Sequence, residues 1–281
     1  MLALDAALAA QARGELERET VAITFDDGYR NNLTVAGPIL ERFGFPATLF
    51  VTTGFIDSEK LLWPNRILQA VQRTALTSLY WRDHDFPLVD KRDKSAANAR
   101  LQAAAKSLSP QDPGAIAEEI EHALEVPVNP STAPGTDFTM VSSAEIAAAR
   151  HKGIFQFGAH TVTHPILSAL DQKALETEIA GSVESLRRLN GGECVGFAYP
   201  NGRSQDFDAR AIAILRKLGI NHAVATNAQP NTAGSDAFRL GRFAIGASDT
   251  WSILRWKLRK ASVKSRLSRL GSNRRRSQRH L

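Results

Sequence analysis

The stretch that decides the fold of this chain runs Thr24-Phe25-Asp26-Asp27-Gly28-Tyr29. Residues 20–25 are mostly apolar or β-branched, which predicts a short buried strand. Two carboxylates then stand side by side at the carboxyl end of this strand, and Gly28 permits a sharp turn or a close ligand approach. Because active sites of α/β barrels lie at the carboxyl ends of strands, the position of the two carboxylates indicates an active site at this end of the strand. Alone, it fits equally well a polar turn in which Asp27 caps the next helix.

The rest of the chain alternates between strand and helix patterns. Helical spacing over residues 31–43 ends at Gly44, a typical C-cap, and a second apolar run covers residues 47–52. Downstream, we expect strands at 155–159, 195–199 and 221–226, and helices at 143–151, 174–189 and 208–218. This alternation predicts parallel βα units. Periodicity leaves open whether the sheet is open and doubly wound or closes into a barrel.

A pair of histidines follows the expected strand at 155–159, in the order His160-Thr161-Val162-Thr163-His164-Pro165. Two imidazoles four residues apart at a strand end suit one metal ion. The proline disfavours helical geometry at His164, so the pair differs from the helical zinc-protease motif. The alternative is two loop histidines bonded to the backbone. Combined with Asp27, however, the pair predicts a site with two nitrogen ligands and one oxygen ligand, with positions left open as in catalytic metal sites.

These two motifs resemble the first two motifs of the polysaccharide deacetylase, or NodB-homology, family. The resemblance extends through Phe197-Ala198-Tyr199-Pro200-Asn201-Gly202 and covers about residues 19–245. It implies a distorted, incomplete (β/α) barrel. It also implies a divalent metal, usually Zn²⁺, with Co²⁺, Ni²⁺ or Mn²⁺ as alternatives. The implied reaction is hydrolysis of N-acetyl groups on chitooligosaccharide, peptidoglycan or exopolysaccharide sugars.

Carried over by position, the resemblance implies a role for each motif. Asp26 would be the general base, and Asp27, His160 and His164 would be the metal ligands. A backbone N–H near Asn201 would bind the oxyanion, in a loop shaped by Tyr199, Pro200 and Gly202. Without the other motifs, this last segment would be interpreted simply as a turn.

Two departures from the family pattern stand out. Many members have an arginine, oriented toward the catalytic aspartate, where this chain has Ala198. Arg239 or Arg242 would compensate, or both would be surface residues. The leaving amine also needs a proton donor, normally a histidine outside the first two motifs. Among the remaining histidines His222 has the best context, and we expect that a truncated or misassigned start has removed an N-terminal strand carrying the true donor.

We predict a deacetylase domain over residues 16–250, interrupted by a helical insertion at about 57–140. The insertion has little strand character, a helical stretch at 91–124 and a Pro-rich loop at 127–134. Its aromatic side chains, Trp63, Tyr80 and Trp81, would stack on sugar rings or, as the favoured interpretation, anchor the insertion to the barrel.

The charge of the chain is unevenly distributed. Residues 251–281 hold eleven Lys and Arg and no acidic residue, so the other residues carry 24 basic against 29 acidic side chains. We expect a basic, partly disordered tail that makes at most weak contact with a polyanion or a membrane surface, without specific nucleic-acid binding. No apolar run is long enough to span a bilayer, and the first ten residues lack the charge pattern of a signal peptide. The expected location is therefore the cytoplasm.

Two other functions compete with the deacetylase. One is a carbohydrate-binding relative that has kept the metal triad but lost the proton donor. The other is a metal-dependent amidohydrolase acting on a small amide, because the chemistry would be the same and only the pocket would differ. Cys194, the only cysteine, rules out an internal disulfide and is expected to be a small core residue.

Overall fold

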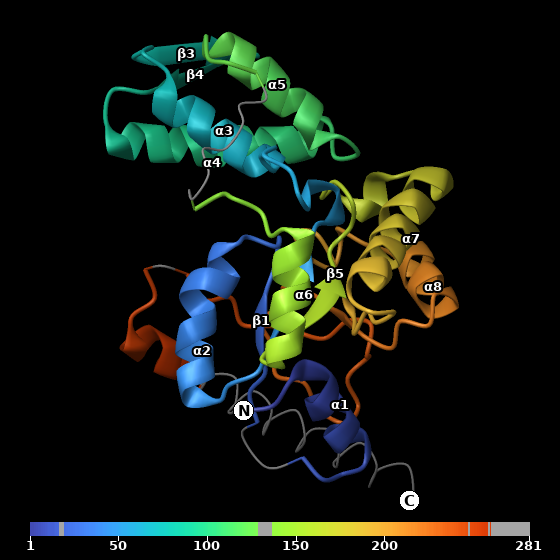
Figure 1. Cartoon of the computed structure of the whole chain (residues 1–281). Helices are drawn as coiled ribbons and strands as arrows, with labels where there is room; N and C mark the ends of the chain where they lie inside the picture. Colours follow the sequence, from blue (N-terminus) through green and yellow to red (C-terminus); the bar gives the residue numbers. More distant parts are fainter. Residues whose placement is uncertain (17–19, 129–136, 247, 258, 260–281) are drawn as a thin grey trace, which may run out of the picture.

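Five short parallel strands form the centre of the molecule (Figure 1). The computed structural model describes residues 1–16, 20–128, 137–246, 248–257 and 259. The strands lie in the order β1-β2-β5-β6-β7. They are β1 (Ile23–Phe25), β2 (Ala47–Val51), β5 (Phe155–Ala159), β6 (Phe197–Ala198) and β7 (Ala223–Val224). All four pairings are parallel, so the carboxyl ends of the strands share one edge.

Helices cover the convex face of this sheet. They are α2 (Gly37–Phe43), α6 (Ser143–Lys152), α7 (Gln172–Leu189) and α8 (Ala209–Lys217). A π-helical turn (Asn32–Ala36) precedes α2, and 3-10 turns occur at Thr53–Phe55 and Leu167–Ala169. Gly44 closes α2 in a left-handed conformation, and Ser142 with Glu145 forms a capping box at α6. Alternate strand residues such as Leu49 and Phe157 pack against apolar side chains of α7 and α8 in the main core.

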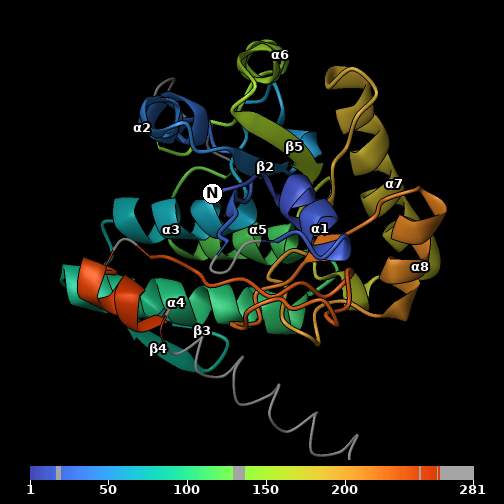
Figure 2. The ribbon, with the colours of Figure 1, turned by 90° about the horizontal axis from the view of Figure 1, so that it is seen from below.

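The concave face of the sheet has a small core of its own. Phe50, Ala198 and Val224 point inward and meet Leu4 of helix α1 (Leu4–Ala12). Leu240 joins this cluster and pairs in parallel with Val224 through a single bridge, so it extends the sheet beyond β7. The predicted incomplete barrel is therefore confirmed. Helix α1 lies beside its strands (Figure 2), and Leu4 of this helix packs in the inner core.

The insertion forms a separate layer over the barrel (Figure 1). It contains α3 (Trp63–Arg73), β3 (Ser78–Trp81), β4 (His84–Pro87), α4 (Lys91–Leu108) and α5 (Pro113–Ala123). The expectation of little strand character is wrong here, because β3 and β4 form an antiparallel hairpin. The expected stretch 91–124 is also two helices, separated near Pro110. Trp63 and Trp81 are only 4% and 7% exposed, so they pack in the core of the insertion, whereas Tyr80 is exposed.

No helix within the described ranges is long and apolar enough to cross a membrane. Trp251 and Trp256 lie exposed in a helical turn near the end of those ranges. The expected disorder of the tail concerns residues outside the described part of the chain. The boundary between the deacetylase domain and the basic tail at residue 250 stays a prediction.

Candidate metal and catalytic site

The motif residues lie together at the carboxyl ends of the strands, in loops with unusual backbone geometry. Asp27, Thr161, His164 and Asn201 all have positive φ angles, of 72°, 66°, 67° and 57°. Such angles are uncommon for residues other than glycine, and for β-branched Thr161 they are a clear outlier. Strained backbone of this kind persists where the surrounding structure fixes it, and it clusters at functional sites.

Asp27, His160 and His164 form one compact cluster. Their ligand atoms lie within 4.8 Å of one another. The Nε2 atoms of His160 and His164 lie 3.4 Å and 3.5 Å from Asp27 Oδ1. These separations exceed hydrogen-bond lengths and match the roughly 3.3–3.6 Å expected between two ligands of one tetrahedral ion with bond lengths near 2.0–2.2 Å.

The surroundings of the triad favour metal ligation. His160 Nδ1 lies 2.7 Å from the carbonyl oxygen of Ala198, which fixes the ring and leaves Nε2 facing Asp27. Burial and repulsion from His160 lower the pKa of His164 to about 4, so this ring is neutral at pH 7. Burial would raise the pKa of Asp27, but its close contact with His160 and the positive charge of Arg242 hold that pKa below its usual range. His164 and Asp27 therefore have the neutral and ionised forms that a divalent cation requires of its ligands. For His160, burial lowers the pKa, but Asp27, Asp26 and the Ala198 carbonyl together raise it above its usual value.

Asp26 is held by an arginine from the far end of the sheet. Arg242 forms a two-pronged ion pair with Asp26, with both N–O distances at 2.7 Å. Its guanidinium also donates to the Thr24 hydroxyl and the Ala225 carbonyl. Arg242 follows Leu240, which extends the sheet beyond β7, so the ion pair joins the two edges of the incomplete barrel. Of the two arginines considered from the sequence, Arg242 is therefore the one at the site; Arg239 instead pairs with Asp236.

The third motif supplies a backbone turn. Asn201 has a left-handed conformation, and Gly202 donates its N–H to the Pro200 carbonyl. No hydrogen bond within the described residues uses the Asn201 N–H, which leaves it free for an oxyanion. The Tyr199 side chain points into the core: it is 1% exposed, stacks on Phe207 and bonds to the Phe238 carbonyl. Tyr199 thus anchors the loop, and its ring is not a substrate contact.

Comparison with protein-family models gives one match, "Polysaccharide deacetylase", over residues 13–107 and 116–223. The chain belongs to the polysaccharide deacetylase family. The family assignment agrees with the resemblance of the three motifs, and it makes the chain a hydrolase of acetylated polysaccharides. A comparison with curated protein sequences gives no match.

Solved structures of deacetylases share the fold of this family member. The deacetylase PplD of Streptococcus pyogenes, in complex with acetate, aligns at a TM-score of 0.56 with 18% identity, covering 91% of this chain and 78% of PplD. A de-N-acetylase from Aggregatibacter actinomycetemcomitans aligns at a TM-score of 0.55 with 15% identity, covering 91% of this chain and 82% of the de-N-acetylase. IcaB from Ammonifex degensii aligns at a TM-score of 0.55 with 18% identity, covering 92% of this chain and 81% of IcaB. At such identities the likeness shows the fold alone.

Two residues that support the deacetylase site were not found from the sequence. Glu178 of α7 accepts the N–H groups of Val162 and Thr163 and the Thr163 hydroxyl, so it fixes the loop between the two histidines. The hydroxyl of Tyr29 interacts with Asp27 and also bonds to Asn65 of α3 at 2.7 Å. Tyr29 stands within the quoted motif, but Glu178 has no local signal because its role depends on how α7 packs.

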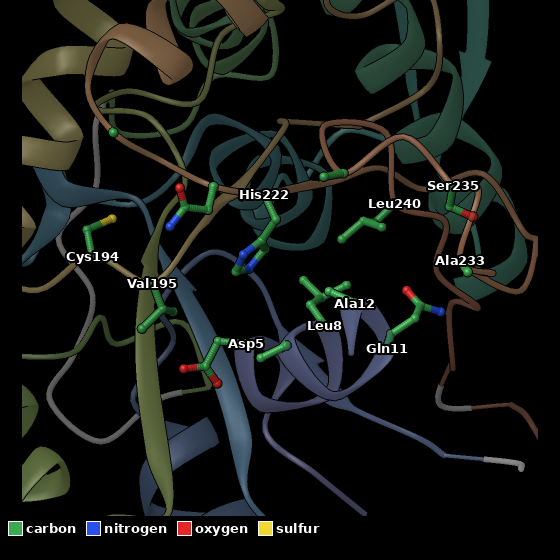
Figure 3. A pocket seen from close by; sticks show the side chains of 14 residues that line it. Asp5, Leu8, Gln11, Ala12, Cys194, Val195, His222, Ala233, Ser235 and Leu240 are labelled. Atoms are coloured by element: carbon green, nitrogen blue, oxygen red, sulfur yellow. The ribbon is translucent and has the colours of Figure 1, made fainter. Parts of the chain in front are cut away.

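His222, the histidine favoured as proton donor from the sequence, lies at the wrong end of the deacetylase barrel. It precedes β7, whereas the triad residues follow their strands. It lines a cavity of about 560 Å³ beside α1, together with Asp5 and Cys194 (Figure 3). That interpretation is therefore wrong, and His222 is a buried structural side chain.

Proposed function

We propose that the chain is a metal-dependent hydrolase that removes N-acetyl groups from an amino-sugar polysaccharide or oligosaccharide. The observation that carries the proposal is the arrangement of Asp26 beside the triad of Asp27, His160 and His164. A carboxylate held by Arg242 next to two imidazoles and a second carboxylate provides a base and a cation site at one strand edge. The name of one structural neighbour, a de-N-acetylase, supports the choice of an amide substrate.

Asp27, His160 and His164 would hold the divalent cation, and Zn²⁺ suits their nitrogen and oxygen donors best. When bound there, the cation supplies Lewis acidity, which lowers the pKa of water and polarises the acetyl carbonyl. Asp26 accepts the proton of the attacking water. Arg242 keeps both Asp26 oxygens oriented, and the Asn201 N–H donates to the oxygen on which negative charge develops.

The test is acetate release from N-acetylglucosamine oligomers by the purified chain, beside the Asp26→Asn variant. The proposal predicts turnover by the wild type and loss of about 10²-fold or more in the variant, which cannot accept the proton. The variant should still bind one metal ion per chain. A chain that binds the oligomers but releases no acetate would instead be the carbohydrate-binding relative. Release only from small acetamides would indicate an amidohydrolase of another specificity.

We also propose, as a separate matter, weak contact of the basic tail with an anionic surface. The exposure of Trp251 and Trp256 beside Arg255 supports it. Deletion of residues 271–281 should lower the amount of protein that sediments with anionic vesicles, and equal sedimentation of both chains would count against it. The cytoplasmic location stays a prediction.

A further inference from the structure

The proposed reaction needs a proton for the departing amine, and no spare histidine of the described residues is placed to give it. His222 lies at the amino end of β7. His84, His122 and His151 are exposed side chains on the insertion hairpin, on α5 and on α6. Within the described part of the chain, none of these histidines contacts the triad.

The insertion brings a lysine toward the site instead. Lys106 lies in the last turn of α4, half-buried, with its Nζ 5.7 Å from the centre of the Trp63 ring. The indole N–H of Trp63 donates to the His164 carbonyl at 3.2 Å. A ring that touches the metal-binding loop therefore carries the lysine ammonium on its face.

A second contact holds this end of α4 against the same loop. Pro110, just after α4, accepts a hydrogen bond from the Ile166 N–H at 2.9 Å. Ile166 is two residues beyond His164, so the contacts of Trp63 and Pro110 bracket the end of the metal-binding loop. These two hydrogen bonds hold Trp63 and the end of α4, which carries Lys106, against the loop that contains His164.

The charged groups that act on Lys106 come from the loop after the third motif. Arg203 repels its ammonium and Asp206 attracts it. The Lys106 charge in turn acts on His164, lowering the pKa of that ring. Burial first, and then Arg203, hold the pKa of Lys106 below 10.5 despite the opposing effect of Asp206. A lysine in such surroundings gives up its proton more readily than one in water.

We propose that Lys106 is the proton donor to the leaving nitrogen, an inference that rests on the proposed deacetylase function. Asp26 takes a proton from water as the water oxygen bonds to the acetyl carbon. The C–N bond then breaks, its electron pair stays on nitrogen, and that nitrogen takes a proton from Lys106 Nζ. Acetate and the free amine leave, and the proton on Asp26 returns to neutral Lys106 through solvent.

The experiment compares two leaving groups on the metal-loaded full chain. An N-acetylglucosamine oligomer must release an amine, which needs a proton, whereas 4-nitrophenyl acetate releases a phenolate that leaves without one. The variants are Lys106→Met and Lys106→Arg, because arginine keeps the charge but does not give up its proton. Lys91→Met, an exposed lysine on the same helix, is the matched control. Circular dichroism confirms that each variant is folded.

We expect both Lys106 variants to lose about 10²-fold or more in kcat on the oligomer, with KM, aryl acetate hydrolysis and the control unchanged. The alkaline fall of kcat, which follows deprotonation of Lys106, should disappear from their residual activity. Full oligomer turnover by Lys106→Arg would overturn the proposal, because charge alone would then suffice. Equal losses on both substrates would also overturn it, since they indicate a structural role. A wild type that cleaves only the aryl acetate would contradict the proposed function itself, an outcome distinct from both.

Discussion

The pairing of Asp26 with Arg242 shows how one residue of the site depends on the whole sheet. A carboxylate that must accept a proton from water has to keep one orientation, and a two-pronged guanidinium provides it. The sequence could narrow the arginine that pairs with the catalytic aspartate to Arg239 or Arg242. The decision between them needed the curvature that brings the segment after Leu240 back to β1, which no local pattern contains.

At this scale we predict that Arg242→Gln lowers kcat by about 100-fold, because the base loses its orientation. Metal affinity should change little, since Arg242 binds Asp26 and not the triad. Arg239→Gln, which removes an exposed partner of Asp236, is the matched control and should keep wild-type kcat. Steady-state kinetics on the oligomer checks both. Equal activity of the two variants would mean that the ion pair is not part of the catalytic machinery.

The second residue prediction concerns acid stability and His222. Burial lowers the pKa of His222 to about 4 from its ordinary value of 6.5. The stability that the folded protein has with a neutral His222 is therefore fully present above pH 6.5. It is lost as pH falls toward 4, because His222 takes up a proton in the unfolded chain before it does so in the folded one. At pH 5 the loss is about 2 kcal/mol by linkage.

His222→Leu should therefore show a shallower fall in the free energy of unfolding between pH 7 and pH 5 than the wild type. His164 also has a lowered pKa, but it is common to both proteins, and metal-free samples of both are compared. Urea titrations at the two pH values give the difference. Parallel falls in the two proteins would contradict a neutral, buried His222.

At the scale of elements, the loop between His160 and His164 is held from outside by helix α7. Glu178 accepts three hydrogen bonds from this loop, two of them from backbone N–H groups. Partners beyond the ligands themselves commonly change metal affinity by 10–100-fold. We predict that Glu178→Ala weakens zinc binding about 10-fold, measured by competition with a chelating dye.

Glu176→Ala is the control for that change. Glu176 lies on the same helix, but it is exposed, and its carboxylate accepts a hydrogen bond from Gln172. This variant should bind zinc as the wild type does. If both variants bind zinc equally well, the loop holds its shape without α7.

Elements with a strong apolar period were predictable, and short or locally ambiguous ones were not. The helices α6 and α7 and the strands β2 and β5 lie within a few residues of the expected ranges. The hairpin of β3 and β4 was missed because Arg82 and Asp83 make its turn in left-handed conformations, without Gly or Asn. Helix α1 was missed because its apolar residues gave no clear amphipathic pattern.

At the scale of the molecule, the barrel and the insertion each have a core, and the site lies where they meet. Asn65 and Trp63 of α3 bond to Tyr29 and to the His164 carbonyl. The motifs predicted the barrel side of this site, including its triad. The insertion side could not be predicted, because contacts between two cores leave no periodic signal in the chain.

The insertion depends on a buried ion pair between Arg66 of α3 and Glu121 of α5. Glu121 is fully buried and accepts two hydrogen bonds from Arg66. Glu121→Gln should lower the free energy of unfolding by about 3–5 kcal/mol, because it leaves a buried charge without its partner. Glu118→Gln, an exposed neighbour 4.0 Å from Arg66, should change it by less than about 1 kcal/mol. Urea unfolding compares the two, and similar midpoints would show that the pair does not stabilise the insertion.

The central claim is that deacetylation takes place at the triad of Asp27, His160 and His164. The most direct test is the rate of acetate release from N-acetylglucosamine oligomers as zinc is added stepwise to the metal-free chain. The account predicts a rate that rises in proportion to bound zinc and reaches its limit at one ion per chain, with no rise in an Asp27→Ala variant. A rate that is already maximal without metal, or that rises equally in the variant, would contradict it.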